Sequence, residues 1–302
     1  MSSSASPNKI IVTGATSIIG RFLLPRLLEA RYEVHALSRK NNPDPAKGNR
    51  GNRFFWHQVD IDDPGQLPKI DGAALIHLAP LWLLPPLLPI LNSIQTKRVI
   101  AFGSTSLFSK AGSRNTGERE LAARLSSAEE KIRRDCGILR INWTVFRPTL
   151  VYDCAQDKNI VQIARFIRRY GFFPLLGAAS GLRQPVHADD LAQACILALD
   201  QSVTFNRSYN LSGGETLTYR RMIEKVFVSL GKPIRFFIVP AWLFRLGIQG
   251  VTLLPGKRSI TPEMATRMNT DLCFFYTDAT KDFGFMPRQF LPAFIPQESP
   301  QR

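Results

Sequence analysis

Residues 10–20, which read IIVTGATSIIG, constrain the fold of this chain more than any other stretch. An apolar run ends at Thr13 in a turn of small residues, and an amphipathic segment, Arg21 to Arg31, follows at once. This order predicts a buried strand that turns into a helix. The free N–H groups and the dipole at such a helix N-terminus attract phosphate groups. Gly14 would permit the tight turn, and Gly20 would permit close packing of the helix on the strand.

The turn departs at one position from the glycine pattern of dinucleotide-binding turns. That pattern has a middle glycine where this chain has Ser17. A hydroxymethyl group is a small obstacle, and its hydroxyl could donate to a phosphate. A glycine pattern alone is weak evidence for dinucleotide binding. Its position at the start of an α/β chain makes this evidence stronger. The residues expected around the diphosphate are Gly14, Thr16, Ser17, Ile18, Ile19 and Gly20.

Strand-like and helix-like stretches alternate in the first half of the chain. Strands are expected at 10–13, 33–37, 53–58, 73–78, 98–103 and 141–147, and helices at about 18–30, 82–94 and 118–136. This alternation predicts an α/β fold with a doubly wound parallel sheet and right-handed crossovers. Pro25 lies too deep in the first helix for the tolerated first turn, so we expect a kink there.

The alternation of strand-like and helix-like stretches becomes less regular after Arg147. Helices are expected at 159–170, 190–199 and 219–230, and strands at 185–187 and 209–211. We expect a disordered tail over 1–9 and a dinucleotide-binding domain over 10–155 that is completed by about 183–203. A smaller C-terminal α/β lobe, 156–182 and 204–302, would hold the substrate.

The chain is strongly basic, with 39 Lys and Arg residues against 24 Asp and Glu residues and a net charge of +15. Such a field favours phosphorylated ligands, anionic membrane surfaces or nucleic acid. No aromatic-rich RNA motif or recognition helix supports nucleic acid as a partner. The four cysteines and four histidines are scattered, so no metal site is expected. We expect reduced thiols in a cytoplasmic protein.

Two apolar segments bear on membrane contact. Residues 72–96 carry no formal charge, but four prolines interrupt them and their first part reads as a buried strand, so a span is not expected. Residues 236–258 leave two interpretations open: packing against the main domain, or docking at the inner face of a membrane. Their apolar residues near helical spacing and their basic residues are Trp242, Leu243, Leu246, Leu253, Arg245, Lys257 and Arg258.

Six short motifs occur in an order that resembles one superfamily. They are TGATSIIG at 13–20, Asp60-Ile61, HLAP at 77–80, GSTSLF at 103–108, RPTLVY at 147–152 and RQPVHADDLA at 183–192. Over roughly residues 10–290 the chain resembles the extended short-chain dehydrogenase/reductases, which include nucleotide-sugar epimerases and dehydratases. The resemblance implies a Rossmann fold and a nicotinamide cofactor. It also implies that Asp60 and Ile61 border the adenine, that Leu78, Ala79 and Pro80 line the ribose side, and that Pro148 lies near the nicotinamide.

The end of the second expected strand bears on cofactor choice. An enzyme specific for NAD would present an acidic residue to the ribose 2′-hydroxyl there, whereas this chain has Ser38, Arg39 and Lys40. A guanidinium can bind a 2′-phosphate through two parallel hydrogen bonds. We therefore expect NADP rather than NAD, with Ser38 and Arg39 at the site. A solvated loop position for Arg39 remains the alternative.

The reaction centre departs from the family. The resemblance implies a Ser or Thr four residues before an aromatic residue, which corresponds to Ser104 and Phe108. It also implies a Tyr-x-x-x-Lys pair with a Glu four residues after the Lys. If Glu130 is that residue, the Tyr and Lys positions hold Ala122 and Ser126. No Tyr-x-x-x-Lys occurs in the chain, so the phenol with a lowered pKa that moves a proton is missing.

Several residues near this centre remain candidates. Ser104 and Thr105 would contact a substrate oxygen, or Ser104 would bond the local backbone. Lys110 is the nearest replacement for the general acid, or a surface lysine. Dehydratases of the family carry Asp-Glu where this chain has Thr105 and Ser106, which disfavours a sugar 4,6-dehydratase.

The motif at 183–192 adds candidates in the second half. The resemblance implies that Arg183 contacts the diphosphate of a nucleotide sugar; an ion pair with Asp189 or Asp190 is the competing role. His187 would titrate in a useful range or be structural. Asp189 is expected to be a helix N-cap.

Three functions follow as expectations. The first is an NAD(P)-dependent oxidoreductase or epimerase-like enzyme for a nucleotide-activated sugar or similar small carbonyl substrate. The second is a non-catalytic NADP-binding regulatory or assembly protein, as are the NmrA-like regulators and an accessory subunit of respiratory complex I, which lack the Tyr-Lys pair. The third is a form of either that contacts an anionic membrane. A homodimer is compatible with each.

Overall fold

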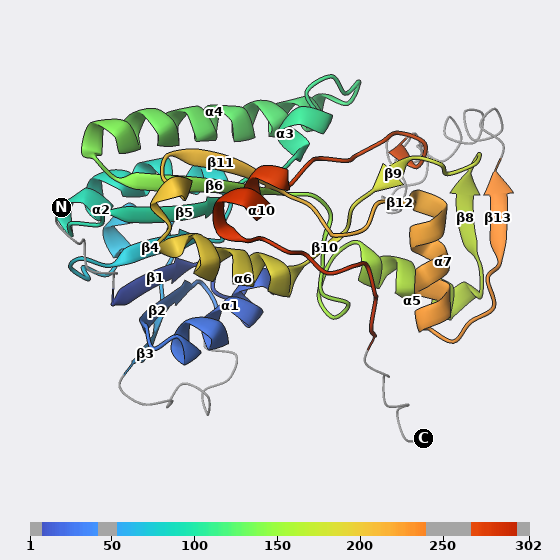
Figure 1. Ribbon diagram of the computed structural model, residues 1–302, viewed down its shortest axis with the longest axis horizontal. Helices are drawn as coiled ribbons and strands as arrows, with labels where there is room; N and C mark the ends of the chain where they lie inside the picture. The colour runs from blue at the N-terminus through green and yellow to red at the C-terminus, as the bar shows by residue number, and fades with distance from the viewer. Residues whose placement is uncertain (1–7, 42–52, 240–266, 295–302) are drawn as a thin grey trace. The chain divides into compact units, whose positions relative to one another are not determined.

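The computed structural model describes residues 8–41, 53–239 and 267–294, which divide between two compact units (Figure 1). The first unit comprises Met1–Pro148, Ala188–Leu211 and Phe275–Met286. The second comprises Thr149–His187, Ser212–Phe274 and Pro287–Arg302. Each unit has its own hydrophobic core.

A seven-stranded parallel sheet forms the centre of the first unit, with strand order β11-β6-β5-β4-β1-β2-β3. The strands are β1 Lys9–Thr13, β2 Glu33–Ser38, β3 Phe54–Gln58, β4 Ala74–His77, β5 Arg98–Phe102, β6 Asn142–Pro148 and β11 Arg207–Leu211. Strands β4 and β5 are buried along their whole length. Such continuous burial is expected where helices cover both faces of a parallel sheet. The expected doubly wound sheet is confirmed.

Helices cover both faces of this sheet (Figure 1). On one face α1 packs against α6, and on the other α4 packs against short turns and α2. The helices are α1 Ile18–Glu29, α2 Leu88–Ser93, α3 Ser106–Ser109, α4 Thr116–Leu139, α6 Ala188–Leu199 and α10 Thr277–Phe283, and the 3-10 turns are η2 Pro64–Gln66, η3 Leu81–Leu83, η4 Pro85–Leu87 and η5 Ser202–Thr204. The order of connections reverses between β1 and β4, which is where α/β sheets bind ligands at the carboxyl ends of their strands.

Prolines have different effects on the two helices that contain them. The helix expected over 82–94 is instead two 3-10 turns, η3 and η4, followed by the short α2. Pro85 and Pro86 provide no N–H group for an α-helical ladder, which explains the break. In contrast, α1 runs from Ile18 to Glu29 with Pro25 inside it. Among the described residues, no helix is both long and apolar enough to span a bilayer.

The second unit is built from short strand pairs and two helices. Its elements are β7 Val151–Tyr152, α5 Ile160–Tyr170, β8 Phe173–Leu176, β9 Leu182–Arg183, β10 Val186–His187, β12 Leu217–Thr218, α7 Tyr219–Ser229 and β13 Phe236–Val239. Strand β10 pairs with β7 and β13 with β8 in parallel, and β12 pairs with β9 in antiparallel fashion. The apolar faces of α5 and α7 form the core of this unit.

The boundaries of the two units differ from those expected. Residues 149–155 join the second unit because β7 pairs with β10. The expected lobe over 204–302 includes β11, which instead pairs with β6 in the first unit, and α10, whose Phe283 packs on Phe146 with ring centroids 5.7 Å apart. Lys9, in the expected tail, begins β1. The apolar residues from Trp242 to Leu253 lie outside the described residues.

Candidate functional site

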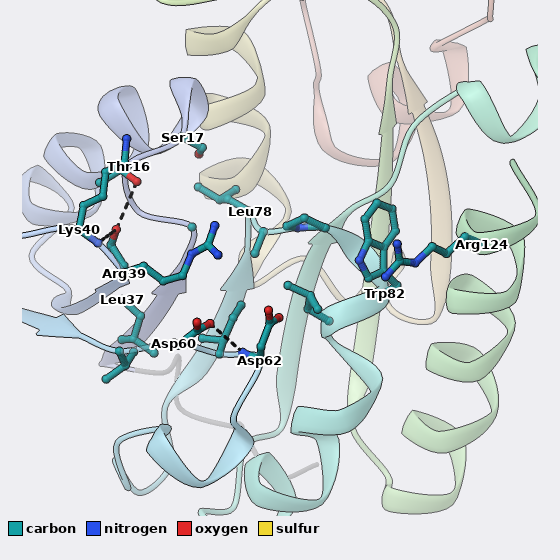
Figure 2. A pocket seen from close by; sticks show the side chains of 17 residues that line it. Thr16, Ser17, Leu37, Arg39, Lys40, Asp60, Asp62, Leu78, Trp82 and Arg124 are labelled. Carbon is teal, nitrogen blue, oxygen red and sulfur yellow. Dashed lines mark hydrogen bonds between the residues drawn. The ribbon is translucent and has the colours of Figure 1, made fainter. Parts of the chain in front are cut away.

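A pocket of about 460 Å³ lies in the first unit, at the carboxyl ends of its parallel strands (Figure 2). The loops that follow β1, β2, β3 and β4 form most of its wall, and Arg124 of α4 completes it. This volume falls in the range of small-molecule binding sites. The expected cofactor-binding residues in its lining are Gly14, Thr16, Ser17, Ser38, Arg39, Asp60, Ile61, Leu78, Ala79 and Pro80.

Two glycines shape the loop between β1 and α1. Gly14 has a φ of +66°, and a Cβ there would lie 2.7 Å from the backbone nitrogen of Ala79. At Gly20 a Cβ would lie 2.2 Å from the carbonyl oxygen of Ala15. Neither position can hold a side chain without displacing backbone atoms. Gly14 therefore permits close packing of this loop against the loop after β4, and Gly20 permits the tight turn into α1.

Ser17, at the place of the missing glycine, is the N-cap of α1. Its Oγ accepts a hydrogen bond from the N–H of Gly20 at 3.1 Å. The hydroxyl hydrogen is still available to a ligand because the oxygen is the acceptor in this bond. No acidic side chain lies in the first turn of α1. The helix terminus therefore keeps its positive potential toward the pocket. Ile18 and Ile19 begin the helix, with Ile19 buried in the core.

His77 fixes the loop that faces this turn. Its Nε2–H donates to the carbonyl oxygen of Pro80 at 3.1 Å, and its Nδ1 accepts from the hydroxyl of Thr13 at 2.8 Å. A carbonyl oxygen can only accept, which assigns the proton to Nε2. Burial lowers the pKa of His77 to about 4, so the ring is neutral at pH 7. The HLAP motif drew attention to this segment, but sequence reasoning gave the histidine no role.

Arg39 and Lys40 extend the far end of β2 and are exposed. Within the described part of the chain, neither side chain forms a hydrogen bond or ion pair. Two side chains of β3 fix the backbone at these positions. Nε2 of Gln58 donates to the carbonyl oxygen of Arg39 at 3.3 Å, and Nε1 of Trp56 donates to that of Lys40 at 3.2 Å. Figure 2 shows the guanidinium of Arg39 pointing into the pocket. The sequence did not indicate that two β3 side chains hold this turn.

Ser38 and Asp60 organise the neighbouring loops. The buried Ser38 hydroxyl oxygen lies 3.3 Å from Oγ1 of Thr16 and accepts from the N–H of Lys40 at 3.1 Å. Oδ1 of Asp60 accepts from the N–H of Asp62 at 3.1 Å. The carboxylates of Asp60 and Asp62 lie near Arg39 in Figure 2 and give the pocket an acidic side next to this cation.

The candidate catalytic residues are engaged in local bonds. Oγ of Ser104 accepts from the N–H of Ser106 at 3.1 Å, which is the local alternative considered for it. The buried Thr105 hydroxyl donates to the carbonyl of Pro148 at 3.1 Å. Nζ of Lys110 lies 3.9 Å from a carboxylate oxygen of Glu118. None of Ser104, Thr105, Lys110 and Pro148 belongs to the lining of the pocket.

The glutamate used to align the Tyr-Lys positions requires a correction. Glu130 is exposed and pairs with Arg133 at 2.7 Å. Its neighbour Glu129 faces the sheet and pairs with Arg147. Counting back from Glu129 gives Leu125 and Leu121 at the Lys and Tyr positions. Leu125 belongs to the core and Leu121 packs against it. Both alignments lack the tyrosine and the lysine.

The candidates from the 183–192 motif are divided between the units. In the second unit Arg183 is buried and donates to the backbone carbonyls of Leu182, Thr270 and Arg267. Burial lowers the pKa of Arg183. The ring of His187 packs edge-on against Tyr152 with centroids 5.0 Å apart.

Asp189 belongs to the first unit and is not the N-cap expected. It lies within α6, which begins at Ala188, and its Oδ1 pairs with Nη2 of Arg26 at 2.7 Å. The helix begins two residues earlier than the expected 190–199, which places the carboxylate in the first turn and not at the cap. Here it joins α6 to α1.

The described cysteines are free thiols, and Cys136, Cys154 and Cys195 are buried. Burial raises the pKa of Cys136 to about 12, so this thiol stays protonated at neutral pH. Among the described residues, no group of three or more His, Cys, Asp and Glu side chains could hold a metal ion.

The sheet order and the position of the pocket resemble those of dinucleotide-binding α/β proteins, and the turn after β1 differs from theirs at Ser17. The family model of the NAD dependent epimerase/dehydratase family matches residues 10–80. The chain is also similar to NADH dehydrogenase (ubiquinone) 1 alpha subcomplex subunit 9, mitochondrial, of Arabidopsis thaliana. The two are 28% identical over 98 residues, which is 32% of this chain and 24% of that protein. The first curated relatives are matched over only 24% to 41% of their own length.

Solved structures extend the similarity to nearly the whole chain. The structure of UDP-glucuronic acid 4-epimerase from Bacillus cereus, in complex with UDP-glucuronic acid and NAD, has a TM-score of 0.70 at 17% identity and covers 94% of this chain and 95% of its own. That of dTDP-glucose 4,6-dehydratase from Bacillus anthracis, in complex with NAD, has a TM-score of 0.68 at 15% identity, with coverage of 94% and 93%. Together with the family model, these likenesses confirm the expected resemblance and the fold.

Proposed function

We propose that this chain binds NADP in the pocket of the first unit and is an NAD(P)-dependent oxidoreductase or epimerase-like enzyme. The observation that carries the proposal is the backbone cradle at Gly14, where a Cβ would lie 2.7 Å from the nitrogen of Ala79. The N–H groups of Ala15 and Ser17 donate to the carbonyl oxygens of Leu37 and Gly14, so a diphosphate would be bound by the N–H groups at the start of α1. When bound, the cofactor supplies hydride transfer at its nicotinamide, and the protein supplies binding and orientation.

Arg39 and Lys40 support NADP over NAD. Both are exposed cations at the end of β2, and the guanidinium of Arg39 points into the pocket in Figure 2. Neither side chain forms an ion pair with another described residue. A 2′-phosphate adds a dianionic group that an arginine binds bidentately. A ribose 2′-hydroxyl, by comparison, is recognised by an acidic residue at this position.

The proposed substrate is a nucleotide-activated sugar or a similar small carbonyl compound. Two of the similar solved structures are a UDP-glucuronic acid 4-epimerase and a dTDP-glucose 4,6-dehydratase, which supports this class. The proton-transfer machinery of such enzymes does not fit this chain, because Leu121 and Leu125 occupy the aligned positions. We assign no proton-transfer step. Arg183 is not part of this proposal, because its Nη1 and Nη2 donate to backbone carbonyls.

A second candidate function is non-catalytic NADP binding, in a regulatory or assembly protein. The apolar pair Leu121 and Leu125 favours it, because neither side chain can protonate a substrate oxygen. The similarity to a subunit of NADH dehydrogenase provides a precedent for the fold in an assembly.

Turnover separates these two functions. The chain is incubated with NADP or NADPH and a panel of UDP- and dTDP-sugars, and products are separated by chromatography and identified by mass spectrometry and proton NMR. An oxidised, reduced or epimerised sugar that requires the chain supports the enzyme. Tight NADPH binding without any product across the panel supports the non-catalytic function.

Peripheral contact with an anionic membrane is the third proposal, and the second unit supports it. Tyr170, Phe172 and Phe237 form an aromatic cluster with exposed fractions of 53%, 37% and 60%. Arg168 and Arg169, in the last turn of α5, precede the cluster directly. Exposed aromatic residues beside cations are typical of surfaces that bind anionic lipid.

Sedimentation with liposomes tests this contact. The chain should co-sediment with phosphatidylglycerol vesicles at low salt and should stay in the supernatant with phosphatidylcholine vesicles. Phe237→Ser should weaken sedimentation, whereas Ile138→Ser should not, since Ile138 is an exposed apolar residue of the first unit. Equal sedimentation of both variants and wild type would contradict the proposed surface.

A further inference from the structure

An arginine stacked on a tryptophan forms the wall of the pocket opposite Arg39. The guanidinium of Arg124 lies 4.0 Å from the ring centroid of Trp82, and both side chains line the pocket. Arg124 comes from α4, and Trp82 comes from the turn η3 that follows β4. Figure 2 shows Arg39 and Arg124 entering the pocket from opposite sides. The motifs recognised in the sequence include neither residue of this pair.

Arg124 keeps its hydrogen-bond donors available. Within the described part of the chain it is exposed and has no hydrogen bond or ion pair, and its interaction is the stack on Trp82. Other arginines of α4 are engaged: Arg119 with carbonyls of the preceding loop, Arg133 with Glu130 and Arg134 with Asp135. A stacked guanidinium uses its face on the ring, and its N–H groups still point outward along its edge.

The stack also orients the cation before any ligand arrives. An unrestrained arginine loses side-chain freedom when it binds a ligand, and this loss lowers affinity. Trp82 holds the guanidinium at the pocket wall, so less freedom remains to be lost. Arg124 therefore has the position, the charge and the restrained side chain that suit an anion-binding residue.

The charges that face the pocket indicate which anion it binds. Asp60 and Asp62 line the side near Arg39, so their carboxylates leave Arg39 and Lys40 as the cations of that side. Arg124 lies beyond Leu78, on the opposite wall. A dinucleotide that places its 2′-phosphate at Arg39 and its diphosphate at the turn after β1 has only the diphosphate left for a second cation.

We propose that Arg124, held by Trp82, binds the diphosphate of the dinucleotide from the wall opposite the N-terminus of α1. This inference rests on the proposed function of the pocket. It gives the two arginines different roles: Arg39 reads the phosphate that distinguishes NADP from NAD, whereas Arg124 binds a group that both cofactors share. The helix that carries a Tyr-Lys pair in the family here contributes a cofactor-binding arginine instead.

Calorimetric titration of the full chain tests the assignment with three ligands: NADPH, NADH and 2′-AMP. Arg124→Gln should weaken NADPH and NADH by a similar factor, roughly tenfold, because one charge-assisted contact is lost. Binding of 2′-AMP, which lacks the diphosphate, should not change. Trp82→Leu should also weaken NADPH and NADH, by a smaller factor than Arg124→Gln, and should leave 2′-AMP binding unchanged. Circular dichroism melting verifies that each variant is folded.

Arg134→Gln is the matched control, because Arg134 is an exposed arginine of the same helix outside the pocket lining. It should leave all three affinities within about twofold of wild type. Unchanged NADPH and NADH affinities in folded Arg124→Gln would overturn the inference and leave the proposed function standing. An equal loss of 2′-AMP would overturn the diphosphate assignment. A wild-type chain that binds no dinucleotide would overturn the proposed function itself.

Discussion

The Nε atom of Arg147, on β6, lies 3.0 Å from both carboxylate oxygens of Glu129 on α4. The two side chains are only 21% and 12% exposed. This ion pair joins the long helix to the sheet, on the same side as the buried apolar residues of α4. Leu125 then faces the core, and Arg124 reaches the pocket. The pair therefore links the stability of the first unit to the composition of the candidate site.

Replacing Glu129 tests that link. Glu129→Gln leaves a largely buried guanidinium without its anion and should lower the free energy of unfolding by about 2 kcal/mol. Glu130→Gln removes a fully exposed partner of Arg133, so it should lower the free energy of unfolding much less than Glu129→Gln does. Urea unfolding of the two neighbouring variants provides the comparison. Equal losses would contradict the assignment of Glu129 as the buried partner.

The glycine turn gives a second prediction. Gly14→Ala requires a strained positive φ and a contact of 2.7 Å with the backbone of Ala79, so it should abolish measurable NADPH binding and lower the melting temperature. Gly137→Ala, in α4, meets no atom within 4 Å and should stabilise the chain by roughly 0.5–1 kcal/mol. Calorimetric melting and titration of both variants measure these effects. If Gly14→Ala bound NADPH like wild type, the cradle would have no role in binding.

Arg39 determines the preference for the 2′-phosphate. Arg39→Ala should weaken NADPH about tenfold to a hundredfold, because a charge-assisted contact is lost, and NADH by less than about twofold. Fluorescence titration with each reduced cofactor measures the ratio. Lys69→Ala, an exposed lysine of the same unit, should change neither affinity. Equal losses of NADPH and NADH in Arg39→Ala would overturn the assignment of NADP.

His77 makes stability depend on pH. Its pKa is about 4 in the folded chain and near 6.5 in the unfolded chain, so the unfolded chain takes up the proton first as the pH falls. The stabilisation by the neutral ring is thus present above about pH 6.5 and is lost between pH 6.5 and 4, by up to about 3 kcal/mol.

His77→Gln isolates this contribution. Glutamine keeps a donor for Pro80 and an acceptor for Thr13 but does not titrate. Urea unfolding at several pH values from 7 to 4.5 should give a shallower decline for the variant than for wild type. The other histidines contribute to both proteins and cancel in the difference. Parallel declines would show that His77 is not the buried neutral ring described above.

Much of the first unit could be predicted from its apolar runs. Strands buried on both faces must be almost continuously apolar, and the expected 10–13, 33–37 and 98–103 match β1, β2 and β5 within a residue or two. The two-residue strands β9 and β12 could not be predicted. Their pairing joins Arg183 to Leu217, which are distant in sequence and have no periodic pattern around them.

The residues of the candidate site that belong to one loop could be predicted from the sequence. Those that come together from distant segments could not. The turn at Gly14 and the cation Arg39 were found because local sequence determines them. The stack of Arg124 on Trp82 joins residues from two elements, so no local pattern indicates it. The contacts of Arg183 with the carbonyls of Arg267 and Thr270 could not be predicted for the same reason. Glu129 and Glu130 are adjacent, and only the rotation of α4 distinguishes them.

Calorimetric titration of the wild-type chain with NADPH and NADH tests the central claim most directly. The account predicts that NADPH binds at one site per chain, more tightly than NADH, and less tightly as salt concentration rises. The absence of measurable heat of association with either dinucleotide, at low salt and with a folded chain, would contradict it.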